Sequence, residues 1–289
     1  MAHRMTTRAP PRILTIAGSD SSGGAGIQAD IKTITMLGGY AMSAITTVTA
    51  QNSVGVRAIA PMSGDVVAQQ IAACVEDIGV DAIKLGMLHD AQIIEAVADG
   101  LRAVHSNVPV VLDPVMVATS GAVLIADEAI ELMRERLFAR ASLITPNLPE
   151  LEHLSRRTLR STDLVEQAAR ALIEEHGCAV LAKGGHTGGG AGGGGGGGAG
   201  KVLDILLVPG GDEGVRTRQF QHSRVDSRHT HGTGCTLSAA IATLMGHGQP
   251  MEHAVQLARQ FVRQAILAAP GFGEGNGPLG HQAVRKLAD

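Results

Sequence analysis

Short apolar runs alternate with amphipathic segments of helical length along most of this chain. The apolar runs predict strands at residues 12–18, 44–50, 81–86, 108–114, 142–147 and 179–185. Helices are expected between and after them, at roughly residues 26–37, 64–78, 90–104, 126–139, 162–176, 234–246 and 251–269. Asp163, followed three residues later by Glu166, is typical of a capping box that opens the helix over 162–176.

This alternation predicts βαβ units, and hence an α/β fold with a mostly parallel sheet covered by helices on both faces. Several of the strands are apolar nearly throughout, as a sheet buried on both sides requires. Residues 201–225 indicate two or three shorter strands, antiparallel at the edge of the sheet. We expect one domain over residues 12–289, preceded by a flexible segment at residues 1–11.

The stretch from Gly188 to Gly200 is glycine apart from two alanines. Such a segment cannot bury apolar area, so it predicts a mobile surface loop within a hairpin and not a domain boundary. We expect no chemistry from it.

Composition limits the classes of protein that fit. Hydrophobic residues make up 44% of the chain but aromatic residues only 2%, so the core must be aliphatic. With a formal net charge of −3, the chain lacks the excess of positive charge that is typical of nucleic-acid-binding proteins. No run of about 18 apolar residues is present, so no membrane span is expected. Three cysteines, far apart and without a C-x-x-C spacing, argue against a disulfide framework or a zinc knuckle and favour a reducing cytoplasm.

Polar and glycine-containing segments follow the predicted strands. They are "GSDSSGGAG", "QN", "GM", "DPVM", "TPN" and "KGGH". In open parallel sheets, ligands bind beyond the carboxyl ends of the strands, so these segments are expected to gather at one ligand-binding edge.

The first glycine cluster contains "GAGIQA", from Gly24 to Ala29, which matches the dinucleotide-binding pattern G-x-G-x-x-G/A. A Rossmann site also needs an acidic residue about 20 positions later, and none occurs between Asp30 and Asp65. The cluster also lacks the G-K-[ST] ending of a P-loop. A close backbone approach to a small ligand is the favoured interpretation, and a plain strand-to-helix turn is the alternative.

Asn147 and Glu150 form an N-x-x-E pair after a predicted strand. The pair fits a capping box, and it also fits the few protein ligands of a hydrated magnesium ion, with Asp113 from the preceding strand nearby. Lys183 follows the next strand. It is either a solvated charge or a contact to nucleotide phosphates.

The segment "HGTGCTLSAA" runs from a glycine-flanked loop into a predicted helix. Backbone N–H groups of Gly232, Thr233 and Gly234 at a helix start make an anion site. Cys235 fits a small buried hydrophobe, the commoner fate of a free cysteine. At the first turn of a helix it is alternatively a thiol with a lowered pKa. The "HTH" at His229–His231 lacks a further ligand of suitable spacing, so metal binding there is not expected.

Together these segments resemble the hydroxymethylpyrimidine/phosphomethylpyrimidine kinase family of the ribokinase-like superfamily. The matching stretches are "LTIAGSDSSGGAGIQADIKT", "VTAQN", "IKLGML", "VLDPVM", "LITPNLPE", "AKGGH" and "HGTGCTLSAA". The resemblance implies a three-layer αβα fold, usually dimeric, that takes ATP with Mg²⁺. It implies phosphorylation of 4-amino-5-hydroxymethyl-2-methylpyrimidine and then of its monophosphate, in thiamin biosynthesis.

The resemblance also implies roles for single residues. The pyrimidine would contact Gly18, Asp30, Gln51 and Met87. Asp113 and Glu150 would hold magnesium, with Asn147 and Lys183 on the nucleotide. The anion hole would comprise Gly232, Thr233, Gly234 and Cys235. Gln51 suits its role because an amide offers a donor and an acceptor to an aminopyrimidine edge.

Most ribokinase-like enzymes carry an aspartate where this chain has Cys235. A carboxylate about 4 Å from a phosphate acceptor would repel it by roughly 4 kcal/mol at an effective dielectric near 20. We therefore hypothesise that Cys235 is a tolerant base that permits both transfers. The alternatives are a pyridoxal kinase of the cysteine-bearing branch and, from another class, a catalytically silent pyrimidine sensor.

Overall fold

The computed structural model describes residues 9–284 apart from 119, 120, 122 and 187–199. The described strands form one sheet in the order β3-β2-β1-β4-β5-β6-β7-β8-β9. Their bounds are β1 (Arg12–Asp20), β2 (Tyr40–Gln51), β3 (Val56–Pro61), β4 (Ala82–Leu85), β5 (Val110–Leu112), β6 (Leu143–Ile144), β7 (Ala179–His186), β8 (Lys201–Pro209) and β9 (Val215–Ser223). Neighbours from β2 to β7 pair in parallel, whereas β3, β8 and β9 pair antiparallel.

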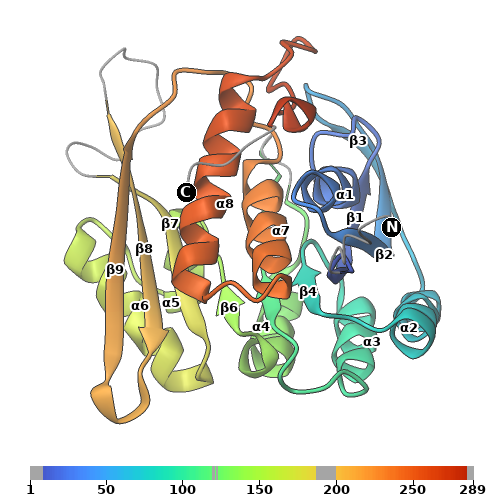
Figure 1. Ribbon diagram of the computed structural model, residues 1–289, viewed down its shortest axis with the longest axis horizontal. Coiled ribbons are helices and arrows are strands. Elements are labelled where there is room, and N and C mark those ends of the chain that lie inside the picture. The colour runs from blue at the N-terminus through green and yellow to red at the C-terminus, as the bar shows by residue number, and fades with distance from the viewer. Residues whose placement is uncertain (1–8, 119–120, 122, 187–199, 285–289) are drawn as a thin grey trace, which may run out of the picture.

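Helices cover both faces of this sheet (Figure 1). They are α1 (Gly26–Met36), α2 (Gly64–Ala73), α3 (Ala91–Leu101), α4 (Asp127–Leu137), α5 (Leu148–Ser155), α6 (Thr162–His176), α7 (Thr233–Gly246) and α8 (Met251–Leu267). The α1, α7 and α8 helices lie on one face, and α2 to α6 lie on the other.

The core is divided by the sheet into two aliphatic layers. Val111 and Leu143 pack with α7 and α8, whereas their neighbours Leu112 and Ile144 pack with α2 to α6. Adjacent residues of a strand point to opposite faces, so a central strand must be apolar throughout to bury both. The predicted three-layer αβα fold with a mostly parallel sheet is therefore confirmed.

Most predicted elements are present, with ends that differ by a few residues; β1 and β2 extend beyond their predicted bounds, and β4 and β5 are shorter. The segment 201–225 forms the antiparallel edge hairpin of β8 and β9, as expected. The short elements β3 and α5 were not predicted as a strand and a helix. The helix predicted over 64–78 is regular only to Ala73 and continues as a π-helical turn, Cys74–Ile78.

The predicted capping box of α6 is wrong. Ser161 is the N-cap, and its hydroxyl accepts the backbone N–H of Leu164. Asp163 lies inside the first turn, because the helix already begins at Thr162. An N-cap must have extended backbone angles, and Ser161 supplies them.

Two sequence predictions fall on parts of the chain that lack a description. The polyglycine stretch, apart from Gly200, and the first eight residues lie outside the described residues. Within the described part of the chain, no helix combines the length and apolar character that a membrane crossing needs.

Candidate active site

A cavity of about 220 Å³ opens at the carboxyl ends of the parallel strands. All but one of the residues that the sequence singles out line it. They are Gly18, Gln51, Met87, Asp113, Asn147, Glu150, Lys183, Gly232, Thr233, Gly234 and Cys235. Residues from β1, β2, β7 and α7 therefore meet at one edge of the sheet, as the topology of a parallel α/β fold requires.

The start of α7 packs tightly against the first glycine cluster. Gly232, the N-cap, has a φ of +83°, and a Cβ there would lie 1.8 Å from the carbonyl oxygen of Gly24. No residue but glycine fits this position without moving the backbone. The backbone N–H groups of Gly234 and Cys235 belong to the first turn, where the helix itself supplies no acceptor. These groups and the helix dipole give the cavity an anion-binding wall.

Two charged side chains lie beside that wall. Lys183 Nζ is 2.7 Å from Asp113 Oδ1, which also accepts the hydroxyl of Thr145 at 2.9 Å. A Cβ on Gly234 would lie 3.3 Å from Asp113 Oδ2 and 3.4 Å from Lys183 Nζ, which shows how close the pair is to α7. Burial would raise the pKa of Asp113, but the charges of Lys183 and Lys84 outweigh it and lower the pKa. Asp113 is therefore ionised in this site.

The capping box at α5 is present. Asn147 Oδ1 accepts the backbone N–H of Glu150 at 2.9 Å, and Glu150 Oε2 accepts that of Asn147 at 2.8 Å. Both residues also line the cavity, so the cap places them at the ligand edge. Burial and the charge of Asp113 raise the pKa of Glu150 to about 7, although Lys183 acts in the opposite direction.

Asp30 does not fit the role of a pyrimidine contact. Its carboxylate is fully buried, with Oδ2 at 2.8 Å from Lys84 Nζ and 2.6 Å from the hydroxyl of Thr15, and it does not line the cavity. In α1, Asp30 shares its buried face with Ile27 and Ile34, which turns it toward the sheet. The sequence contained a signal that was missed: Lys84 interrupts the apolar strand β4 and is the counter-ion that such a buried carboxylate needs.

Cys235 is partly exposed and lines the cavity, but its thiol is not activated. Burial, followed by the charges of Asp30 and Asp113, raises its pKa to about 11 against the opposing charge of Lys84. The expectation of a lowered pKa is therefore wrong. The favourable helix start is outweighed by the loss of water and by two carboxylates from other elements. The thiol is neutral at neutral pH.

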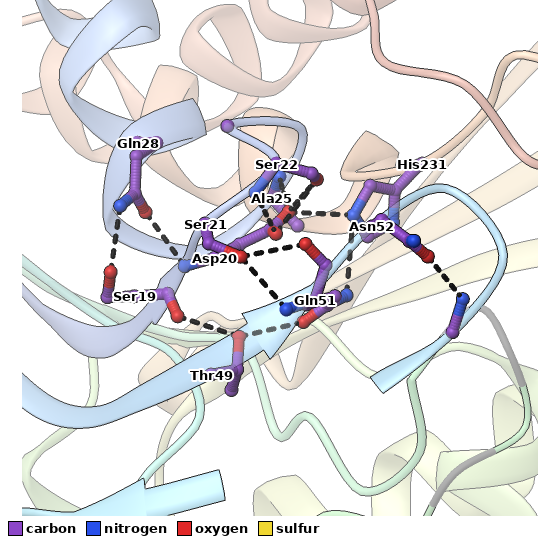
Figure 2. Close-up of polar contacts among 12 residues, drawn as sticks. Ser19, Asp20, Ser21, Ser22, Ala25, Gln28, Thr49, Gln51, Asn52 and His231 are labelled. Carbon is purple, nitrogen blue, oxygen red and sulfur yellow. Dashed lines mark hydrogen bonds and ion pairs between the residues drawn. The ribbon is translucent and has the colours of Figure 1, made fainter. Parts of the chain in front are cut away.

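Sequence reasoning also missed a buried pair beside Gln51 (Figure 2), on the side of the cavity that Gly18, Gln51 and Met87 line, here called the ring side. His231 Nε2 lies 2.8 Å from Asp20 Oδ2, and Gln51 Nε2 lies 3.4 Å from the same imidazole nitrogen. The histidine pair at 229 and 231 was weighed as a metal motif, whereas the partner of His231 comes from the distant glycine cluster. Only the packing of α7 against that cluster reveals the contact.

Comparisons with known proteins place the chain in a family. The family model described as phosphomethylpyrimidine kinase matches residues 20–280. The hydroxymethylpyrimidine/phosphomethylpyrimidine kinase of Bacillus subtilis strain 168 is 41% identical over 275 residues, which cover 95% of this chain and 96% of that protein. A bifunctional thiamine biosynthesis protein of Geobacter sulfurreducens is 43% identical over 277 residues, and the match spans 53% of its length.

A solved structure extends the comparison to the fold. The pyridoxal kinase of Staphylococcus aureus, in complex with AMP-PCP and pyridoxal, superposes with a TM-score of 0.82 at 31% identity and covers 96% of each chain. The matches of the family model and of the Bacillus subtilis kinase span nearly the whole chain. The chain therefore belongs to the phosphomethylpyrimidine kinase family, and it is a phosphotransferase of that family.

Proposed function

We propose that this protein transfers the γ-phosphoryl group of ATP to 4-amino-5-hydroxymethyl-2-methylpyrimidine and then to its monophosphate, in thiamin biosynthesis. One observation carries the proposal: a single cavity joins an amide and a methionine on one side to an anion-binding helix start and a lysine–aspartate pair on the other. The names of the relatives and the nucleotide analogue in the pyridoxal kinase complex support it.

The ring side would hold the pyrimidine through Gln51, Gly18 and Met87. The side chain of Met87 lies over Gly18, where a Cβ would come within 2.5 Å of the Met87 methyl carbon. Because Gly18 has no side chain, the Met87 thioether can lie close to the backbone of β1. A flat pyrimidine ring would pack against this surface. The Gln51 amide supplies the polar contacts.

The other side would hold the nucleotide phosphates, with Lys183 and the start of α7 as their cationic and N–H partners. Asn147 would also contact the nucleotide. In phosphoryl transfer, most of the catalysis comes from positioning and charge stabilisation, which these groups provide without covalent chemistry.

The donor set also fits magnesium. Among the described residues, no group of three or more histidine, cysteine or acidic side chains could hold a metal on its own. Mg²⁺ commonly uses one or two carboxylates together with phosphate oxygens and water, and Asp113 and Glu150 line the cavity as that pair. When bound, the ion would neutralise phosphate charge. Burial raises the pKa of Glu150 to about 7. A bound cation beside this carboxyl would lower its pKa and so favour the ionised form that binds the metal.

Cys235 would face the acceptor as a neutral thiol. A neutral group tolerates both an alcohol and a phosphate monoester beside it, whereas a carboxylate would repel the second acceptor. The tolerance then comes from the neutral thiol and does not require Cys235 to act as a base, because burial raises the pKa of the thiol to about 11.

Mass analysis of the products formed from MgATP and the hydroxymethylpyrimidine tests the proposal. Appearance of the monophosphate and then the diphosphate is expected. The pyridoxal kinase complex favours one alternative, pyridoxal phosphorylation, so pyridoxal should be compared at equal concentration. Preferred turnover of pyridoxal without diphosphate formation would reject the proposal, and pyrimidine binding without ADP release would indicate a sensor.

We also propose a homodimer that works in the cytoplasm. Large apolar side chains are exposed at one end of the sheet, on β2 and in the turn that follows it: Tyr40, Val48 and Val54. The three cysteines are free, which supports a reducing compartment. Sedimentation equilibrium would give twice the chain mass if the dimer forms.

A further inference from the structure

The buried Asp20 carboxylate lies at the centre of a hydrogen-bond cluster on the ring side of the cavity (Figure 2). Oδ1 accepts the backbone N–H and the hydroxyl of Ser22 at 2.9 and 2.8 Å, and Oδ2 accepts the backbone N–H of Ala25 at 2.8 Å. Burial would raise the pKa of Asp20, but these bonds and the one to His231 outweigh it and lower the pKa. The carboxylate is therefore ionised at neutral pH and can only accept hydrogen bonds.

The imidazole of His231 must donate to this carboxylate. Its Nε2 lies 2.8 Å from Asp20 Oδ2, and both side chains are buried. An ionised carboxylate has no hydrogen to give, so the hydrogen of this bond sits on Nε2 in either charge state of the ring. The next residue, Gly232, caps α7, so the same side chain ties the cluster to the anion-binding wall.

The side-chain amide of Gln51 has one end 3.4 Å from His231 Nε2 and the other end 3.1 Å from Thr49 Oγ1. Figure 2 draws the nitrogen toward His231, which would set two donors against each other. The Thr49 hydroxyl has one hydrogen for two acceptors, the carbonyl oxygen of Ser19 at 2.9 Å and, in the drawn orientation, the amide oxygen of Gln51 at 3.1 Å. An amide turned by 180° removes both conflicts, because Nε2 then donates to Thr49 and Oε1 faces the single Nε2 hydrogen of His231, which it shares with the closer oxygen of Asp20.

We propose that Asp20, His231 and Thr49 are positioning residues that fix the Gln51 amide in this second orientation and so set which way round an aminopyrimidine binds. The inference rests on the proposed function, which places the pyrimidine against Gln51. With one N–H given to Thr49 and one oxygen lone pair turned toward the His231 N–H, the amide keeps one N–H and one lone pair for the ligand. A ring nitrogen next to an exocyclic amino group is complementary to that pair.

The orientation of the amide also decides where the acceptor hydroxyl lies. In 4-amino-5-hydroxymethyl-2-methylpyrimidine, the hydroxymethyl group is on the carbon next to the one that carries the amino group. If the amide were reversed, the ring would have to turn over to keep both hydrogen bonds, and the hydroxymethyl group would move to the other side of Gln51. A 4-oxo analogue presents an N–H beside a carbonyl, which is the opposite pattern, so the fixed amide disfavours it.

Calorimetric titration of the nucleotide-free protein with the aminopyrimidine and with its 4-oxo analogue tests this proposal. The wild-type protein should bind the amino compound at least tenfold more tightly (about tenfold for each 1.4 kcal/mol), because the mismatched edge leaves buried polar groups unpaired. His231→Leu removes the donor at similar volume and should lower this ratio about tenfold, the equivalent of one hydrogen bond. His231→Gln keeps an N–H that can reach Asp20 and should retain most of the ratio.

Two further variants make the experiment decisive. His247→Asn alters a histidine that bonds to the carbonyl of Leu37 away from the cavity, and it should leave the ratio unchanged. Thr49→Val removes the other partner of the amide and should lower the ratio as His231→Leu does, which provides a second test if the latter does not fold.

The outcomes separate the inference from the function on which it rests. A purely structural role for His231 and Thr49 would weaken both ligands equally, so an unchanged ratio in folded variants would overturn the inference alone. A wild-type protein that does not bind the aminopyrimidine would overturn the proposed function, and the inference with it.

Discussion

Cys235 lies at the first turn of α7, on the wall where an acceptor would meet the nucleotide phosphates. Cys235→Asp would place a carboxylate about 4 Å from a phosphate acceptor and repel it by roughly 4 kcal/mol, or about a thousandfold. We expect kcat/KM for the monophosphate to fall by about that factor, and kcat/KM for the alcohol to fall about tenfold or less. Steady-state assays with each acceptor measure the split. Cys235→Ser, which stays neutral, should retain both activities, and equal losses in the aspartate variant would reject the argument.

The reactivity of the same thiol checks its charge directly. Because the pKa of Cys235 is raised to about 11, its thiolate fraction should rise about tenfold for each pH unit between pH 7 and 9. Alkylation by iodoacetamide, followed by peptide mass mapping to separate Cys235 from the other cysteines, should show that slope without a plateau. A plateau below pH 9 would mean that the helix start lowers the pKa after all.

The position of a residue in the site was predictable from the sequence where a motif fixes the backbone conformation or marks the end of a strand. Gly232 and Lys183 follow from such motifs, and both line the cavity. The environment of Asp30 and the pKa of Cys235 did not follow, because each depends on charges that arrive from other elements. Lys84 on β4 pairs with Asp30, and Asp113 after β5 acts on the thiol. The local sequence around each residue does not encode those distances.

At the scale of elements, the N-cap of α6 gives a matched pair of variants. Ser161→Ala removes the hydroxyl that accepts the Leu164 N–H and should lower the free energy of unfolding by about 1 kcal/mol. Asp163→Ala should cost clearly less, about 0.5 kcal/mol, because that side chain only interacts with the helix dipole. Urea denaturation followed by circular dichroism measures both. A larger loss for Asp163→Ala would restore the capping box that the sequence suggested.

The short turn at residues 281–283 carries a pH-dependent contact to α7. His281 is buried, its Nε2 lies 2.8 Å from the hydroxyl of Thr236, and burial followed by the charge of Lys32 lowers its pKa to about 4. The folded state therefore keeps the imidazole neutral, whereas the unfolded chain takes up a proton as the pH falls below about 6.5. This difference stabilises the folded protein above pH 6.5. As the pH falls from about 6.5 to about 4, the free energy of unfolding should decrease by about 3 kcal/mol in total.

His281→Asn cannot titrate, so the comparison isolates this contribution. The variant should show a shallower loss of unfolding free energy between pH 6.5 and 4 than the wild-type protein, measured by urea denaturation at each pH. Parallel pH profiles for the two proteins would show that His281 is protonated in the folded state.

Element type followed from the sequence wherever a periodic pattern was long. The α6 and α8 helices repeat an apolar stripe over many residues, and they lie where they were expected. The β3 strand was missed because half-exposed edge strands carry a mixed pattern, and α5 because it is only two turns long. The exposure of most of β3 follows from its place at the edge of the sheet, where it pairs with β2 alone, which is a tertiary contact.

For the whole molecule, the sequence predicted a covered parallel sheet but not the order of its strands. That order requires long-range pairing, such as β1 between β2 and β4, which no local pattern encodes. The order matters for the site, because it places β1 and β2 with their ring-side residues on one side of β4 and places β5 to β7 with the phosphate-side residues on the other.

Because one sheet separates the two core layers, the layers should unfold together. Val111 and Leu112 are adjacent on β5 and fully buried, yet they belong to opposite layers. Val111→Ala should lower the free energy of unfolding by about 2 kcal/mol and Leu112→Ala by about 3 kcal/mol, and both should shift the same single transition without changing its slope in urea.

Circular dichroism and the exposure of Cys178, which is buried in the layer of Leu112, provide two probes. If α7 and α8 unfolded as a separate unit, Val111→Ala would make the circular dichroism change begin before the thiol becomes reactive. Coincident curves in both variants would show that the strands beneath the cavity hold its two sides as one cooperative structure.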